Sequence, residues 1–238
     1  MAQYLAQCLI KERDLSTVVL SLDDFYLTRS ERQVLARDVH PLLMTRGVPG
    51  THDVGLLART LDSLSVAGET GGAATVPRFD KSQDDRIEIE CWDSYEVPTD
   101  LVLLEGWCLG ASGDEPVTLK QPLNDLERDE DSDGRWRSYS DTALKNLYVP
   151  LYERFTFWLM LRAPSFEEVL RWRTEQEEKL RESVGNAGAG LMDDVALKRF
   201  VAHYERHTRQ CLRDLPQRVD VLLNLDEQRQ ILSCSGLN

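Results

Sequence analysis

Short, largely apolar runs alternate with longer amphipathic segments along the chain. Residues 17–22 and 101–104 are such runs and are rich in β-branched or aliphatic side chains. This composition over so few residues is typical of strands buried on both faces of a parallel sheet. Between the runs, apolar residues recur at helical spacing. The pattern predicts strands at 17–22, 75–78, 87–92, 101–104, 155–161 and 218–223, and helices at 1–11, 30–43, 54–66, 138–153, 165–183 and 192–213.

The order of these elements predicts the fold class. Strands that alternate with helices are joined by right-handed crossovers, which place helices on both faces of a mostly parallel sheet. We therefore predict an α/β fold of this kind. In such sheets the ligand binds beyond the carboxyl ends of the strands. Asp23 and Asp24 directly follow one predicted strand and Glu105 follows another, so we expect all three carboxylates at the functional site.

Three segments interrupt the regular pattern. Residues 68–74 are predicted to be flexible, and residues 185–190 to form a glycine-rich break after a long charged helix. Residues 112–135 are acidic and rich in Asp and Gly, which predicts a mobile insertion. The length of 238 residues suits one large α/β domain, so we expect a single domain over residues 1–238.

Charge and cysteine content narrow the class of protein. The net charge of -13 argues against a nucleic-acid-binding surface, which relies on clustered Lys and Arg. The longest apolar runs are far shorter than the roughly 20 residues of a membrane-spanning helix. The five cysteines are scattered without CxxC spacing, and the N-terminus lacks the pattern of a signal peptide. We therefore expect a cytoplasmic protein with reduced thiols and no membrane or nucleic-acid partner. Its oligomeric state is not predicted.

The acids at the strand ends suggest phosphoryl transfer. One carboxylate there can accept a proton from a substrate hydroxyl, while a second holds Mg²⁺ directly or through water. Asp23, Asp24 and Glu105 are the candidates. The alternative is that Asp23 or Asp24 only caps the next helix or binds loop amides, as Asp commonly does.

The loop of residues 46–53 is a second candidate. Its sequence, RGVPGTHD, offers a guanidinium, a hydroxyl, an imidazole and a carboxylate on a backbone stiffened by proline. These groups could orient a small anionic polyol. The alternative is a turn with a capping Asp53, and His52 alone would more often be a structural histidine than a catalytic one.

Two further charged segments have two interpretations each. Arg78, Asp80 and Lys81 surround Phe79, and they could bind substrate or form a local ion pair. Arg171 and Arg173 begin a highly charged helix. They could supply positive charge to a transferring phosphoryl group. On the residues alone, a solvated face with i,i+4 ion pairs is favoured for this helix.

Taken together, several ordered motifs resemble the plant-type D-glycerate 3-kinases and their kinase-like relatives, in the clan of uridine kinase, phosphoribulokinase and pantothenate kinase. The resemblance runs from residue 1 to about residue 232, and the RGVPGTHD loop is its most specific element. It implies a P-loop NTPase-like fold and transfer of a phosphoryl group from ATP, with Mg²⁺, to the hydroxyl of a small hydroxy acid, with D-glycerate as the expected acceptor. The motifs are SLDDFY at 21–26, RGVPGTHD at 46–53, PRFDK at 77–81, EGW at 105–107 and RWR at 171–173.

The resemblance also implies roles for individual residues. Asp23 would be the base or orienter of the substrate hydroxyl, and Glu105 would lie near Mg²⁺. Arg171 and Arg173 would belong to a lid that closes over the ATP phosphates and would complete the catalytic set. The implied substrate-binding set is Asp24, Tyr26, Arg46, Thr51, His52, Asp53, Arg78, Asp80 and Lys81.

One feature of the resembling family is not found in the sequence. No GxxxxGK[ST] occurs, although this Walker A loop supplies the amides and lysine that cradle ATP phosphates. We therefore expect the first strand and the phosphate-binding loop of the fold to be missing, which would leave unpaired inner sheet edges. Three hypotheses remain open. Met1 is an internal methionine of a longer kinase, or the chain is a binding or regulatory protein that has lost nucleotide binding, or it is an inactive fragment.

Overall fold

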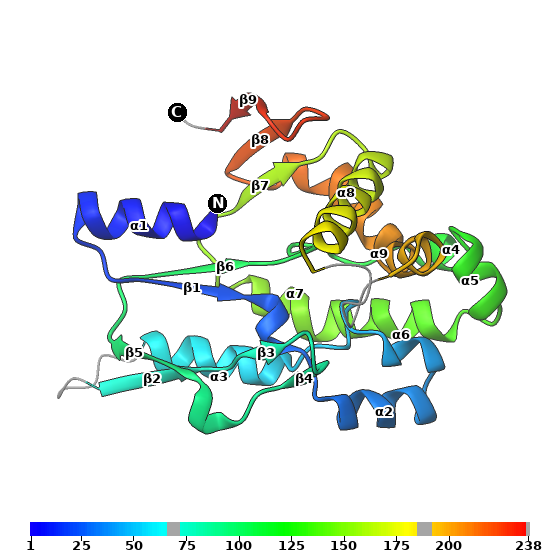
Figure 1. Cartoon of the computed structure of the whole chain (residues 1–238), viewed down its shortest axis with the longest axis horizontal. Coiled ribbons are helices and arrows are strands. Elements are labelled where there is room, and N and C mark those ends of the chain that lie inside the picture. The colour runs from blue at the N-terminus through cyan, green and yellow to red at the C-terminus, as the bar shows by residue number, and fades with distance from the viewer. Residues whose placement is uncertain (66–71, 185–191, 237–238) are drawn as a thin grey trace. The chain divides into compact units, whose positions relative to one another are not determined.

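The computed structural model describes residues 1–65, 72–184 and 192–236. The chain divides into two compact units, Met1–Leu109 and Gly110–Asn238, here called the N-terminal and C-terminal units. Both units contain helices and strands (Figure 1). None of the helices within the described ranges is both long and apolar enough to cross a membrane. The expectation of one domain over the whole chain stays a prediction.

The N-terminal unit is built on two parallel strands. β1 (Thr17–Ser21) pairs in register with β6 (Leu101–Glu105), so that Ser21 lies opposite Glu105. Their carboxyl ends therefore meet at one edge of the sheet, as the sequence predicted. The unit's other elements are α1 (Ala2–Arg13), α2 (Arg29–Asp38), α3 (Val54–Ser65), β2 (Gly72–Val76), β3 (Phe79–Asp80), β4 (Asp85–Arg86) and β5 (Asp93–Val97).

Helix α3 provides much of the apolar core of this unit. It lies against β2 and β5, which pair antiparallel with each other (Figure 1). Leu57 and Leu64 of α3 are fully buried, as are Val76 of β2 and Leu20 of β1. Burying one such side chain contributes roughly 1.5–3 kcal/mol.

The C-terminal unit contains a three-stranded sheet and a group of helices. β7 (Leu159–Arg162) pairs parallel with β8 (Val221–Leu225), which pairs antiparallel with β9 (Ile231–Ser235). Phe166 of α8 packs with Leu197 and Val201 of α9 in the core. The helices are α4 (Pro116–Leu119), α5 (Asp125–Glu130), α6 (Arg135–Ala143), α7 (Val149–Tyr152), α8 (Phe166–Val184) and α9 (Asp194–Asp214).

The α/β fold class with a parallel sheet is confirmed. The described strands form separate sheets, however, and not one continuous sheet. Among them β6 pairs with β1 alone and β7 with β8 alone, so each parallel pair has an edge strand. The expectation of a missing first strand that leaves inner edges unpaired stays a prediction. Leu159 and Leu161 of β7 are both about two-fifths exposed, at 41% and 42%.

Several predicted boundaries are wrong. The strand expected at 87–92 is a 3₁₀ turn at Ile89–Cys91, because the partner strand β2 takes its register from residues 93–97 instead. Pairing thus overrides the β-propensity of the isoleucines. The helix expected at 30–43 ends at Asp38, since Pro41 disfavours helical backbone at the residue before it. The hairpin strand β9 was not predicted. The break at 185–190 and most of the segment 68–74 lie outside the described residues.

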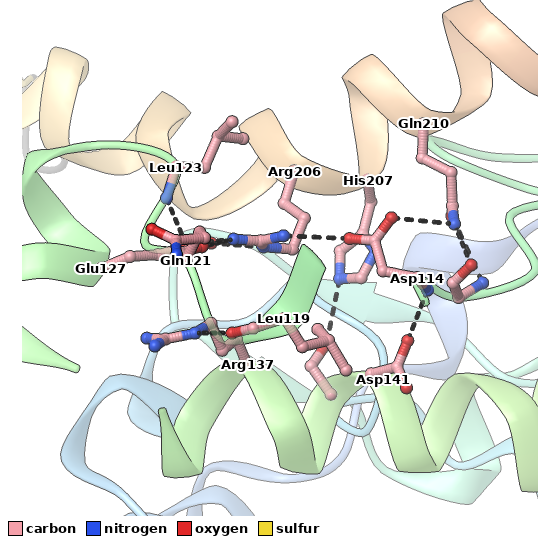
Figure 2. A network of polar contacts seen from close by, with 12 residues as sticks. Asp114, Leu119, Gln121, Leu123, Glu127, Arg137, Asp141, Arg206, His207 and Gln210 are labelled. Carbon is pink, nitrogen blue, oxygen red and sulfur yellow. Dashed lines mark hydrogen bonds and ion pairs between the residues drawn. The ribbon is translucent and has the colours of Figure 1, made fainter. Parts of the chain in front are cut away.

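The segment 112–135 differs from the mobile insertion expected from its composition. It contains α4 and α5, and three of its carboxylates, those of Asp114, Glu127 and Asp131, are buried. Arg206 of α9 explains how two of them are accommodated (Figure 2). Its guanidinium donates to both carboxylate oxygens of Glu127 at 2.7 and 2.5 Å, and to Asp114 Oδ2 at 3.0 Å. Two of the acids of this segment therefore serve its packing against a buried arginine.

Candidate active site

Asp23 lies in a single 3₁₀ turn, Leu22–Phe25, directly after β1. Two side chains bind its carboxylate. The Tyr26 hydroxyl donates to Oδ1 at 2.7 Å, and Lys81 Nζ donates to Oδ2 at 2.5 Å. Burial opposes ionisation of Asp23, but the hydrogen bond and charge of Lys81, with the Tyr26 hydroxyl, hold its pKa below the ordinary value of 3.8. Asp23 is therefore an ionised acceptor at neutral pH.

Asp24 has a different environment from its neighbour. Arg78 Nη1 donates to its Oδ2 at 2.5 Å, and the Phe79 amide donates to its Oδ1 at 3.2 Å. Arg78 also pairs with Asp93 at 2.6 Å. Asp24 and Arg78 thus hold the β3 segment to the end of β1. For these two residues the structure shows an ion pair between segments far apart in sequence, and not a local pair within residues 78–81.

The loop of residues 46–53 lies beside Asp23 because it runs antiparallel to residues 25–27. The Leu27 amide donates to the Thr51 carbonyl at 2.9 Å, and the Asp53 amide donates to the Phe25 carbonyl at 2.7 Å. Tyr26 and His52 form the bridge between these bonds. Two residues 26 positions apart in sequence are thereby placed side by side.

His52 is buried against the ring of Tyr26. The two rings stack with centroids 4.6 Å apart. Burial lowers the pKa of His52 to about 4, although the negative charge of Asp23 opposes this change. The imidazole is consequently neutral at physiological pH, where it can donate through one nitrogen and accept through the other.

Two other residues of the loop close its turns. The Thr51 hydroxyl donates to the Val48 carbonyl at 2.7 Å and accepts from the Gly47 amide at 2.9 Å. Asp53 Oδ1 accepts from the Leu56 amide at 2.8 Å, at the start of α3. The structure thus shows the capping role that was the alternative for Asp53.

Arg46 lies over two aromatic rings. Its guanidinium carbon is 6.0 Å from the ring centroid of Tyr26 and 5.5 Å from that of Phe79. It is ion-paired with Asp84, which also binds the buried Arg32. The sequence interpretation missed Asp84 and Arg32. Arg32 lies on a polar helix, and no sequence pattern marks it as buried.

The remaining predicted residues of the N-terminal unit lie at its surface. Glu105 is exposed at the end of β6, opposite Ser21. Asp80 is directed to its own turn, where Ser82 and Gln83 donate to it. These bonds, chiefly from Ser82, hold the pKa of Asp80 below its ordinary value.

Arg171 and Arg173 belong to the C-terminal unit. Arg171 donates to Glu168 at 2.7 Å and to Glu175 at 2.8 Å on the same helix. Arg173 donates to Gln176 at 2.8 Å. These are the helical ion pairs and hydrogen bonds favoured by the sequence alone, and the lid role of both arginines stays a prediction.

Comparison with known proteins identifies relatives for nearly the whole chain. No protein-family model matches it. The chain is 31% identical over 206 residues to "D-glycerate 3-kinase, chloroplastic" of Arabidopsis thaliana, which covers 82% of this chain but only 41% of the plant protein. It is 28% identical over 226 residues to "Probable ATP-dependent kinase TDA10" of Saccharomyces cerevisiae, covering 90% of this chain and 74% of the yeast protein.

Solved structures agree with these relatives. The D-glycerate 3-kinase of Cryptococcus neoformans matches 99% of this chain and 85% of its own, with a TM-score of 0.76 and 25% identity. The phosphoribulokinase of Rhodobacter spheroides matches 98% of this chain and 70% of its own, with a TM-score of 0.51, and at 9% identity it supports the fold alone. By its relatives the chain is homologous to D-glycerate 3-kinase and TDA10-like kinases, and by its structure it has the fold of the P-loop kinases.

Proposed function

We propose that this chain provides the acceptor site of an ATP-dependent kinase of the cytosol that phosphorylates a hydroxyl of D-glycerate. One observation carries the proposal. The ionised Asp23 carboxylate lies at the end of a parallel strand, bound by Tyr26 and Lys81 and bordered by the loop of residues 46–53. The names of the plant and fungal relatives support the choice of ATP as donor and D-glycerate as acceptor.

Asp23 would orient the hydroxyl that attacks the phosphoryl group. In a loose transition state the attacking oxygen needs positioning more than early deprotonation. A carboxylate with a lowered pKa suits this task, because it accepts the hydroxyl hydrogen bond and takes the proton late in the reaction. Lys81 and Tyr26 fix the carboxylate through one oxygen each, which limits its rotation.

The anionic end of the acceptor would be recognised by nearby cationic and neutral donors. Arg46 can bind a carboxylate with two parallel N–H groups, which gives direction as well as charge. His52 is neutral, so it can add a hydrogen bond to a hydroxyl without a second full charge. A short hydroxy acid such as glycerate presents both groups within a few bonds of each other.

Mg²⁺ fits the residues present. Glu105 offers an exposed carboxylate at the same sheet edge as Asp23, and Mg²⁺ prefers oxygen ligands while keeping several waters. Bound there, the ion would neutralise charge on the phosphates. The loop that usually binds the ATP phosphates is not among these residues, since the sequence contains no GxxxxGK[ST]. The proposed roles therefore concern the acceptor and the metal.

The proposal is tested by D-glycerate binding and ATP turnover measured together. Calorimetry with the 238-residue chain measures binding, and a coupled ADP assay measures turnover of this chain and of a version extended upstream to the next in-frame start codon. Asp23→Asn should lower the turnover rate at least about a hundredfold, the effect expected for loss of a group that orients the hydroxyl and accepts its proton. Asp38→Asn, at an exposed pair with Arg37, is the matched control. Turnover that survives in Asp23→Asn would contradict the assignment of Asp23.

The second candidate is a binding or regulatory protein that retains the acceptor site described above. It predicts D-glycerate binding that does not depend on ATP or Mg²⁺, with no turnover by either form of the chain. Binding with turnover by either form would exclude it. Absence of binding and turnover, with both forms folded, would overturn D-glycerate as the ligand.

A further inference from the structure

Asp84 has an unusual backbone conformation and an unusual pair of partners. It lies in the turn between β3 and β4 with a φ of 56°, in the left-handed region that few residues other than glycine adopt. Its carbonyl accepts from Arg32 Nη2 at 2.6 Å, and its Oδ2 accepts from Arg32 Nη1 at 3.1 Å. A glycine would adopt this turn more readily but would have no carboxylate. The aspartate therefore points to a task for the side chain.

Arg32 is a rigid anchor for this carboxylate. Its side chain is only 1% exposed. Besides Asp84, it donates to the Leu27 carbonyl at 3.2 Å and to the Met44 carbonyl at 2.8 Å. These bonds connect the start of α2, the turn before residue 46 and the β3–β4 hairpin. Because its donors are directed in a fixed fork, Arg32 sets the position of Asp84 with little freedom.

The other oxygen of Asp84 holds Arg46. Arg46 Nη1 is ion-paired with Asp84 Oδ1, and the Arg46 side chain is 24% exposed. The guanidinium carries N–H donors in a fixed fork and stays partly exposed, so an anionic group can approach it from solvent.

The pairing also fixes where Arg46 lies relative to Asp23. The guanidinium is held over the faces of Tyr26 and Phe79, and the Tyr26 hydroxyl donates to Asp23. A cation over an aromatic face gains only a modest attraction and would not by itself fix a long, flexible side chain. The carboxylate of Asp84 supplies the missing directional constraint.

We propose that Asp84 is a positioning residue, which holds Arg46 over Tyr26 and Phe79 so that Arg46 receives the anionic group of the acceptor. The inference rests on the proposed function for the identity of that acceptor. The geometric part of the inference is independent of the proposed function, because the position of Arg46 can be observed without any ligand. The two parts can therefore fail separately.

The test begins with Asp84→Asn, since asparagine tolerates the left-handed backbone and differs from aspartate mainly in charge. Asp85→Asn is the matched control, because it removes the same charge one residue away at a carboxylate bound by the Arg29 and Arg86 amides. In a crystal structure of Asp84→Asn, we expect the Arg46 guanidinium to leave the two rings while Arg32 keeps its bonds to Leu27 and Met44. Arg46 in an unchanged position would overturn the proposal.

Binding supplies the second readout. Calorimetry should show Kd for D-glycerate rising about tenfold in Asp84→Asn, the size expected for loss of one charge-assisted interaction, and unchanged in Asp85→Asn. In an Arg46→Ala background, Asp84→Asn should weaken binding no further, because its effect acts through Arg46. Equal weakening in both backgrounds would overturn the proposal. If the unaltered chain does not bind D-glycerate, the proposed acceptor is wrong, and the crystal structure decides the positioning role.

Discussion

Replacing Arg206 with methionine should strongly destabilise the C-terminal unit. The change removes four hydrogen bonds, two to Glu127, one to Asp114 and one to the Gln121 carbonyl (Figure 2). Glu127 is 1% exposed and the Asp114 side chain 8% exposed, so both carboxylates stay buried without their main counter-ion. Removing one partner of a buried ion pair costs about 3–5 kcal/mol. Methionine nearly fills the volume of the arginine stem, so a cavity adds little to the loss of stability.

The free energy of unfolding can be measured by urea titration followed by tryptophan fluorescence, to which the buried Trp136 of the same unit contributes. Arg199→Met is the matched control. Arg199 lies on the same helix and pairs with Glu130, but both side chains are nearly half exposed, and such pairs contribute at most about 1 kcal/mol. The double variant Glu127→Gln/Arg206→Met should recover part of the loss, because it removes the unpaired charge. A loss for Arg206→Met no larger than for Arg199→Met would refute the reasoning.

Two further predictions concern titration. Lys81→Met should raise the pKa of Asp23, because burial raises this pKa and Lys81 no longer lowers it. An NMR titration of the carboxyl group measures the pKa, and an unchanged value would contradict the role of Lys81. With its lowered pKa, Asp23 stabilises the fold above its unfolded value near 3.8, and this contribution is lost as pH falls through the lowered pKa. The free energy of unfolding should also decrease as the pH is lowered from 6.5 to about 4. His52, His203 and His207 are buried with a pKa of about 4, so they bind protons more readily in the unfolded state. Urea unfolding at pH 7, 6 and 5 should show this decrease, and a flat profile would exclude it.

The sequence predicted those parts of the fold in which local pattern and tertiary environment impose the same demand. Residues 17–22 and 101–104 were recognised because they are apolar at nearly every position, as strands covered on both faces are. In the described structure β1 alternates buried and half-buried residues, and β6 is half-buried except at Glu105. Strand β5, by contrast, has the sequence DSYEV, which alternates weakly and contains two acids. Only its pairing with β2 makes it a strand. Because β2 (Gly72–Val76) and β5 (Asp93–Val97) are not adjacent in sequence, this pairing leaves no local signal in the sequence of β5.

The same distinction applies to the site. Asp23 and Glu105 were predicted at one sheet edge because parallel strands bring their carboxyl ends together, and the register of Ser21 with Glu105 agrees. The Asp84–Arg46 pair joins residues 38 positions apart, across a loop and a hairpin of only two-residue strands. No periodicity connects such positions, so only the folded structure reveals the pair.

The geometry of the loop at 46–53 gives a physical reason for its distinctive sequence. Gly47 and Gly50 have φ values of 119° and 94°, which other residues rarely adopt, and Thr51 closes the turn between them with its hydroxyl. Most of the motif is therefore structural, since it sets the path that brings the loop against residues 25–27. Under the proposed function, the chemistry of the motif is assigned to Arg46 and His52, the two side chains that lie against Tyr26. A likeness in this motif is thus evidence first for a shared loop conformation, and only through those two side chains for a shared acceptor.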